Sequence, residues 1–161
     1  MILVRVDEAM EECDLHLTAT NSFGSQVEAI LTSYCCSVIY AEFEDQVRRI
    51  VAERGAGVGT DAHVTSFTKW AALRLVRSIK IGELAGIAAQ FDSTCKARFN
   101  DAIDAQTQNA WDTILANRRD VAHVNTSTSA ISNLTFDELK SLYPTALLVL
   151  EHLKDCLEPQ T

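Results

Sequence analysis

The sequence is poor in the residues that interrupt helices. It has 161 residues but only six glycines and two prolines, Pro144 and Pro159. This scarcity argues against a turn-rich β-sandwich and favours long helices. Hydrophobic residues make up 47% and charged residues 22%, which is typical of a folded chain rather than a disordered one. We therefore predict one all-α domain over residues 1–161, an antiparallel bundle of four or five helices.

A long apolar run is also missing. The longest candidate, Ala29 to Ala41, is interrupted by Thr32 and Ser33, and it is shorter than the roughly 20 residues that span a bilayer. At the amino terminus an acidic residue, Asp7, comes too early for the apolar core of a cleavable leader. We therefore expect a cytoplasmic protein with no membrane partner.

The spacings typical of metal sites and disulfide frameworks are absent from the sequence. The cysteines are odd in number and include one adjacent pair, with no C-x-x-C, so we predict reduced thiols in the core. The histidines show neither H-x-x-x-H nor H-E-x-x-H spacing, so we expect no metal and no cofactor. These residues are Cys13, Cys35, Cys36, Cys95, Cys156, His16, His63, His123 and His152.

Acidic residues outnumber basic ones, and the formal net charge is −8. Such a charge disfavours tight, non-specific binding to long nucleic acids. The distribution is uneven, however. Residues 1–61 hold four basic and eleven acidic residues, whereas residues 62–119 hold eight basic and five acidic ones. A locally cationic middle can therefore bind a phosphate group.

Apolar residues at helical spacing predict the elements of this bundle. Ser25 is the expected N-cap of the longest helix and Gly55 its C-cap. Thr135 and Glu138 form a capping-box pattern for the last helix, which Pro144 should kink or shorten. The third helix should bury Val64, Phe67, Leu73, Leu75, Val76 and Ile79, and both tryptophans, Trp70 and Trp111, should lie in the core or a dimer interface. The expected helices cover residues 6–19, 25–54, 62–79, 82–90, 107–124 and 135–157, with irregular or helical residues between 91 and 105.

A glycine-rich stretch, residues 55–61, superficially resembles a phosphate-binding loop. It follows a predicted helix rather than a strand, and it lacks both G-x-G-x-x-G spacing and a Gly-Lys-Ser/Thr sequence. We interpret it as a helix end and a connection.

The residues best suited to chemistry lie between Leu115 and Asn125. Arg118, Arg119, Asp120 and His123 fall within six residues at the end of an amphipathic helix. Histidine titrates near neutral pH and can transfer a proton. Arginine keeps its charge and can bind two phosphate oxygens at once. This set suits cleavage of an RNA phosphodiester by its own 2′-hydroxyl, which needs a base, an acid and positive charge at the phosphorus.

The stretch Arg118-Arg-Asp-Val-Ala-His123 resembles the R-x4-H motif of HEPN domains. The segment from Ser33 to Glu44 is similar to the second helix of the RiboL-PSP-like HEPN branch, an aliphatic run that ends in aromatic–Glu. The last helix, preceded by Leu134-Thr-Phe-Asp-Glu-Leu139, also matches that layout, so the resemblance spans most of the chain.

The resemblance implies a homodimer in which two motifs face each other across a cleft. It implies metal-independent endoribonuclease activity, as in toxin–antitoxin or phage-defence systems, with RNA as substrate and an antitoxin or defence protein as partner. By position, Arg118 and His123 are the catalytic pair. Glu44 matches the glutamate of the second helix and would orient one of them.

Two departures from the family pattern matter. Arg119 occupies a position where Asn, Asp or His is usual, and Asn125 stands where toxins modified by nucleotidyltransferases carry Tyr, so AMPylation is not available there. On an ideal helix Arg118 and His123 point about 140° apart, whereas Arg119 and His123 share a face. Either arginine could therefore serve. The alternative function is a catalytically inactive HEPN bundle that binds a nucleotide or a partner protein.

Overall fold

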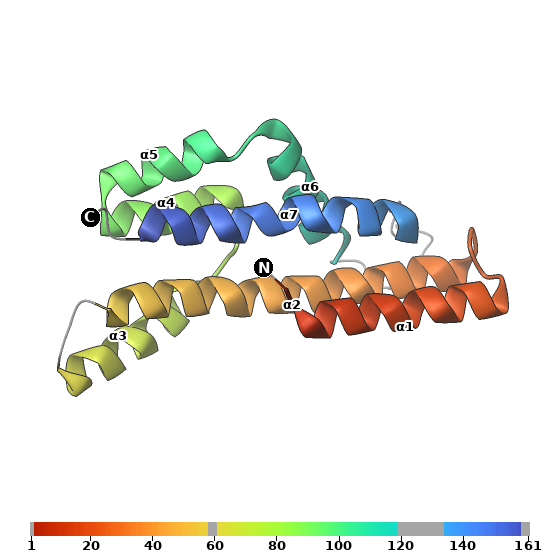
Figure 1. Ribbon diagram of the computed structural model, residues 1–161, viewed down its shortest axis with the longest axis horizontal. Coiled ribbons are helices and arrows are strands. Elements are labelled where there is room, and N and C mark those ends of the chain that lie inside the picture. Colours follow the sequence, from red (N-terminus) through yellow and green to blue (C-terminus); the bar gives the residue numbers. More distant parts are fainter. Residues whose placement is uncertain (1, 58–60, 119–133, 159–161) are drawn as a thin grey trace, which may run out of the picture. The chain divides into compact units, whose positions relative to one another are not determined.

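Figure 1 presents the computed structural model, which describes residues 2–57, 61–118 and 134–158. Within these ranges the regular structure is entirely helical, which confirms the predicted all-α class. The described residues form seven helices: one in each of the six expected segments and one more in the stretch 91–105, which the sequence left open between helix and irregular structure. The predicted bundle of four or five helices is not confirmed. The helices are α1 (Val4–Thr20), α2 (Gln26–Ala56), α3 (Ala62–Leu75), α4 (Ile81–Phe91), α5 (Ser93–Ala102), α6 (Ala105–Asn117) and α7 (Phe136–Leu157).

Contacts divide the chain into two compact units. Unit 1 comprises Met1–Glu42 and Asn109–Leu147, and unit 2 comprises Phe43–Gln108 and Leu148–Thr161. Each unit thus combines two separate stretches of the chain, and helices α2, α6 and α7 each contribute residues to both. The single-domain expectation stays a prediction.

Unit 1 has a tightly packed apolar core. Along α1, Val6, Cys13 and Leu17 are buried on one helical face, as their spacing predicts. Helix α1 ends at Asn21, whose φ of 51° lies in the left-handed region that asparagine tolerates. The predicted N-cap of α2 is confirmed, since Ser25 Oγ accepts a hydrogen bond from Val27 N at 3.1 Å. Fully buried large side chains of this unit are Leu17, Ile39, Trp111, Ile114, Phe136 and Leu139.

The start of α7 is held by two sets of hydrogen bonds in unit 1. Thr135 N donates to Glu138 Oε2 at 2.8 Å and Glu138 N donates to Thr135 Oγ1 at 3.2 Å, so the predicted capping box is confirmed. In addition, the buried Glu28 accepts from Phe136 N at 2.8 Å and from Gly24 N at 2.5 Å. Pro144 lies inside α7, which begins at Phe136 and therefore well before the proline.

Unit 2 contains short helices whose boundaries are set by aspartates. Asp92 Oδ1 accepts from Thr94 N at 2.8 Å and starts α5, in a region where the sequence pattern left helix and irregular structure open. Asp104 Oδ1 accepts from Thr107 N at 2.7 Å at the start of α6. These hydrogen bonds lower the pKa of both carboxyl groups. The fully buried large side chains here are Phe43, Ile79, Leu84, Phe99, Leu150 and Leu153.

Helix α3 differs most from its prediction. It ends at Leu75 instead of Ile79, and Val76 and Ile79 are buried as expected in the segment that follows. The other four predicted core residues are exposed, and so is Trp70. The reason lies in the side of the helix that packs inward, where the residues are small: Ala72 is buried and Thr65 and Thr68 are half-buried. The four exposed residues are Val64, Phe67, Leu73 and Leu75.

Gly55 does not cap α2, which continues to Ala56. A Cβ atom at Gly55 would collide with the Thr68 side chain of α3. A larger residue at position 55 would force the Thr68 side chain to shift, so the glycine is explained by this contact and not by the end of the helix.

All five cysteines are buried and free, which confirms the predicted reduced thiols. Cys13 and Cys35 are close, with their sulfurs 3.5 Å apart, well beyond the roughly 2.05 Å of a disulfide. Among the described residues, no helix has the length and apolar character of a membrane span.

Candidate active site

The described part of the candidate site begins at the end of α6. Trp111 and Ile114 have no exposed surface, and they anchor this end of the helix in the core of unit 1. Asn117 Nδ2 donates to Thr113 O at 2.8 Å within the last turn. Arg118 follows in a turn, so the predicted helix to Val124 is wrong at this position.

The Arg118 guanidinium lies over the ring of Tyr40 in α2, with Cζ 3.3 Å from the ring centroid. Both side chains are half-buried. Cation–π contacts of this kind contribute about 0.5 to 2 kcal/mol, depending on solvent exposure. Because the N–H groups of arginine lie in the guanidinium plane, stacking on a ring leaves them able to bind oxygen atoms at the edge. Tyr40 thus restricts the orientation of Arg118 without consuming its donors.

No residue of α2 from Ala29 to Ala41 is charged, but two acids, Glu42 and Glu44, follow Tyr40 within about one turn of the helix. Ser37 lies three residues before Tyr40, on the same side of the helix, and its hydroxyl donates to Ser33 O at 3.0 Å. Cys36 is fully buried, and burial raises the pKa of its thiol to about 12. That thiol stays protonated at neutral pH and is no nucleophile.

The described residues resume at Leu134, which is packed in the core of unit 1. Leu134 is buried, Phe136 is fully buried, and Glu28 accepts the hydrogen bond from Phe136 N. The residues on either side of 119–133 are therefore both fixed to unit 1.

Four of the predicted site residues lie in that segment, outside the described residues. They are Arg119, Asp120, His123 and Asn125. Of the predicted residues in this segment the structure describes Arg118 alone, and the pairing of Arg118 with His123 stays a prediction.

Glu44, the remaining predicted residue, belongs to unit 2, where its carboxylate pairs with Arg48 at 3.0 Å. Its proposed role in orienting Arg118 or His123 stays a prediction. A different glutamate of α2, Glu42, is nearly buried and pairs with Arg5 Nη1 at 2.6 Å in unit 1. The aromatic–Glu stretch thus provides two acidic residues with separate ion-pair partners.

Sequence reasoning did not assign a role to Tyr40 or to Glu28. Tyr40 belongs to the aromatic–Glu stretch of α2, and Arg118 is the next residue after α6, so their contact joins distant parts of the chain. Local periodicity carries no signal for such a pair. Glu28 looked like an ordinary first-turn acid. Only its burial and its bond to Phe136, 108 residues away, distinguish it.

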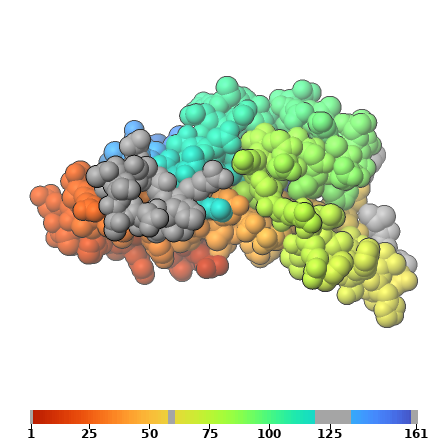
Figure 2. Space-filling model, turned by 180° about the vertical axis from the view of Figure 1, so that it is seen from behind, coloured from red at the N-terminus to blue at the C-terminus, as the bar shows by residue number. Residues whose placement is uncertain are grey.

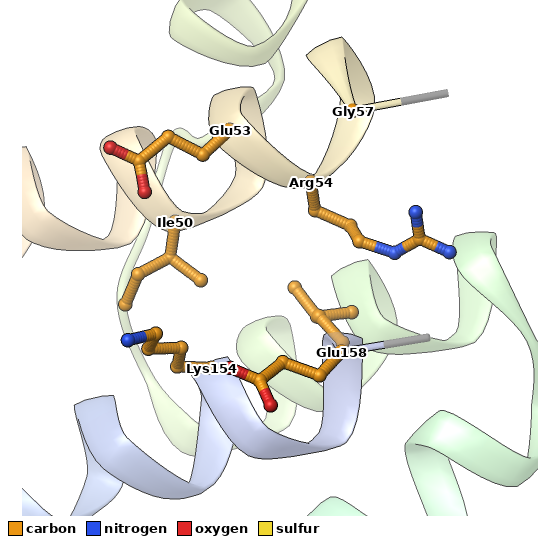
Figure 3. A pocket seen from close by; sticks show the side chains of 7 residues that line it. Ile50, Glu53, Arg54, Gly57, Lys154 and Glu158 are labelled. Atoms are coloured by element: carbon orange, nitrogen blue, oxygen red, sulfur yellow. The ribbon is translucent and has the colours of Figure 1, made fainter. Parts of the chain in front are cut away.

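Unit 2 contains a small hollow at the carboxyl ends of α2 and α7. Figure 3 shows Ile50 pointing from α2 toward α7, with Arg54 extending to one side, Lys154 on α7 and Glu158 just after its end. Its volume is about 220 Å³, less than the roughly 300 Å³ at which small-molecule sites begin. Two cations and two acids line it, so it favours neither sign of charge. None of the predicted site residues takes part.

A wider groove of about 470 Å³ lies between α2 and α3 in unit 2. Three cations line it, but two of them are neutralised by neighbours one turn earlier: Arg48 pairs with Glu44 at 3.0 Å and Arg49 with Asp45 at 3.1 Å. Phosphate binding there would require these pairs to separate. The lining residues are Asp45, Arg48, Arg49, Ala52, Glu53, Lys69 and Leu73.

Comparison with known proteins adds no relative. No family model matches the chain, and no curated protein or solved structure matches it. The fold and the site are therefore defined by the residues themselves: an all-α protein with an arginine stacked on a tyrosine at the end of a well-anchored helix.

Proposed function

We propose that the protein is a metal-independent endoribonuclease of the HEPN type, with an HEPN-like helical bundle. His123 serves as the acid–base group and Arg118 binds the reacting phosphate. Arg119, Asp120 and Asn125 support them from the same segment, and Glu44 is the candidate orienting acid.

The contact between Arg118 and Tyr40 is the observation that carries this proposal. A guanidinium that only balanced helix-end charge would need no aromatic platform, since solvent and the last carbonyls suffice. Stacking reduces the rotamer freedom that arginine would lose on binding a ligand. The two acids that follow Tyr40 in α2, Glu42 and Glu44, are each paired with another arginine, Arg5 and Arg48 respectively.

The reaction that we propose is intramolecular transfer of the phosphoryl group of RNA from the 5′-oxygen to the 2′-oxygen. The 2′-hydroxyl loses its proton to an imidazole and attacks the adjacent phosphorus. The bond from phosphorus to the 5′-oxygen breaks, an imidazolium returns a proton to that oxygen, and a 2′,3′-cyclic phosphate remains. Arg118 stabilises the charge on the non-bridging oxygens throughout. No metal enters any step.

A homodimer is part of the proposal, because two copies of His123 could then act as base and acid in one cleft. The biological setting would be a toxin or phage-defence effector in the cytoplasm, regulated by an antitoxin or another defence protein. The acidic net charge suits a small structured RNA held by few phosphate contacts.

The test is cleavage of labelled RNA by purified protein in EDTA. We expect cleavage that persists in the chelator and is lost in His123→Ala and Arg118→Ala. Arg119→Ala should retain weakened activity. Arg49→Ala is the matched control, because this exposed arginine pairs with Asp45 in unit 2, and it should cleave like the wild type.

Equal rates for Arg118→Ala and the wild type would refute the assignment of Arg118. Intact RNA under every condition, with the variants folded, would favour the alternative of a catalytically inactive bundle that binds a nucleotide or a partner protein.

A further inference from the structure

Helix α3 exposes an apolar face that unit 2 leaves uncovered. Phe67 is 65% exposed, Trp70 is 51% exposed and Leu75 is 70% exposed. On a helix, Val64, Phe67, Trp70, Ala71, Arg74 and Leu75 fall within an arc of about 140°. The rings of Phe67 and Trp70 stack with centroids 6.0 Å apart. Contiguous exposed apolar side chains of this kind mark an interaction surface.

The way α3 is anchored accounts for this exposure. Asp61 accepts hydrogen bonds from His63 N at 2.8 Å and Val64 N at 3.4 Å and fixes the start of the helix. The opposite, small-residue face, with Thr68 and Ala72, packs inward, and Gly55 of α2 permits the close approach of Thr68. The large side chains consequently point away from the rest of unit 2. In Figure 2 the yellow to yellow-green segment that contains α3 is seen at the surface.

The charges of this region have one sign. Residues 62–80 contain four cations and no acidic residue, although the whole chain carries −8, which leaves −12 for the remainder. Arg74 lies over the Trp70 ring, 4.6 Å from its centroid, so cationic and aromatic groups share the exposed face. The four cations, all exposed, are Lys69, Arg74, Arg77 and Lys80.

We propose that α3 is a docking helix for an anionic lipid surface. Trp, Phe and Leu on one side, flanked by Lys and Arg, are what an interfacial helix needs, since the rings enter the headgroup region and the cations bind acidic headgroups. An RNA strand would use the cations but leave Val64 and Leu75 in water. A second copy that docked through α3 would bring like charges together.

The inference is independent of the ribonuclease proposal. The earlier expectation of no membrane partner rested on the absence of a spanning run, and a helix that lies on the surface needs no such run.

Vesicle flotation tests the proposal, with phosphatidylcholine vesicles and with vesicles of phosphatidylcholine and phosphatidylglycerol. We expect the full chain to float with the mixed vesicles at low salt and to dissociate at high salt. Arg74, Arg77 or Lys80 replaced by glutamine should each weaken binding about fivefold, whereas the same change at Lys69, which lines the groove toward α2, should have a smaller effect. Tryptophan emission should shift to the blue on binding. Trp70→Phe should lose this shift, because the other tryptophan, Trp111, is already fully buried, and it should keep most of the binding.

The decisive variant is Phe67→Ser with Trp70→Ser, which should weaken binding at least tenfold. Leu15→Ser is its matched control: Leu15 is 64% exposed on the acidic α1 and should not matter. Far-ultraviolet circular dichroism confirms that each variant is folded. Absence of flotation, equal binding by the double variant, or a dimer in solution that the double variant dissociates would each overturn the proposal. The proposal would also be overturned if the protein did not float with vesicles and the glutamine variants lost RNA binding, because the cations would then serve RNA.

Discussion

The two units are of similar size but carry very different charge. Unit 1 has four basic and eleven acidic residues, a formal charge of −7, whereas unit 2 has ten basic and eleven acidic residues, a formal charge of −1. In unit 1, burial and the charges of Asp7 and Glu42 raise the pKa of Tyr143. The net charge of the chain therefore describes neither unit well. Repulsion of an anionic ligand is expected to be strong at unit 1 and weak at unit 2.

The units also differ in how they use aromatic residues. Trp111 is fully buried in unit 1, whereas Trp70 in unit 2 is half-exposed at the surface. The same contrast holds for acidic caps: Glu28 of unit 1 is buried, and Asp92 of unit 2 is exposed. Each pair permits the same substitution to alanine in both units.

The largest expected effect comes from replacing the tryptophans. Trp111→Ala should lower the free energy of unfolding by about 3 to 5 kcal/mol, because it removes a large side chain from the core. Trp70→Ala should change it by about 0.5 kcal/mol or less, as at other surface positions. Urea denaturation followed by circular dichroism measures both. Similar losses in the two variants would mean that α3 is packed more tightly than its exposure indicates.

The next largest effect concerns the acidic caps. Glu28→Ala should cost about 1 to 3 kcal/mol, because the N–H groups of Gly24 and Phe136 lose a buried acceptor. Asp92→Ala removes an ordinary, exposed N-cap in unit 2, and we expect a smaller loss. Thermal unfolding of both variants tests the order. A greater loss for Asp92→Ala would contradict it.

A third prediction concerns the platform under Arg118 and depends on the proposed ribonuclease activity. Tyr40→Leu should reduce RNA cleavage about 2- to 30-fold, since the cation–π contact contributes roughly 0.5 to 2 kcal/mol. Tyr40→Phe keeps the ring and should cleave at close to the wild-type rate. Single-turnover rates distinguish the two variants. Equal loss in both would assign the effect to the hydroxyl group instead of the ring.

The smallest effect is expected in the response to acid. Hydrogen bonds from Thr135 lower the pKa of Glu138 in unit 1, and hydrogen bonds from Thr94 lower that of Asp92 in unit 2. A carboxyl group whose pKa is lowered by folding stabilises the fold at pH values above its pKa in the unfolded chain. This stability is lost as the pH falls through the pKa of the group in the folded protein. Urea midpoints of the wild type should therefore fall below about pH 5.

Glu138→Gln and Asp92→Asn should each flatten part of this acid limb, because neither amide titrates. Both variants should be less stable than the wild type at neutral pH and closer to it in acid. A pH profile parallel to that of the wild type would show that the substituted carboxyl group does not contribute.

Sequence patterns predicted the fold well where one rule acted alone. The helical class, the Ser25 cap, the capping box at Thr135 and the buried thiols were all correct. The predicted core residues of α3 were wrong because periodicity identifies the apolar side of a helix but not whether another part of the protein covers it. Gly55 was misread for a related reason, since a glycine that ends a helix and one that admits a neighbour look the same in sequence.

The candidate site was predictable only in part. The chemistry of arginine and histidine at close spacing pointed to residues 118–123, and Arg118 does lie at the end of an anchored helix. Tyr40 and Glu28 could not be foreseen, because their contacts depend on how distant segments meet.

The distribution of the buried thiols has a practical consequence. Cys13, Cys35 and Cys36 lie in unit 1, and Cys95 and Cys156 lie in unit 2. A thiol hidden in the native protein can be alkylated only while its surroundings open. Brief exposure to an alkylating reagent, followed by mass spectrometry of the peptides, would therefore report the opening of each unit separately. The natural sequence already contains the reporters for that measurement.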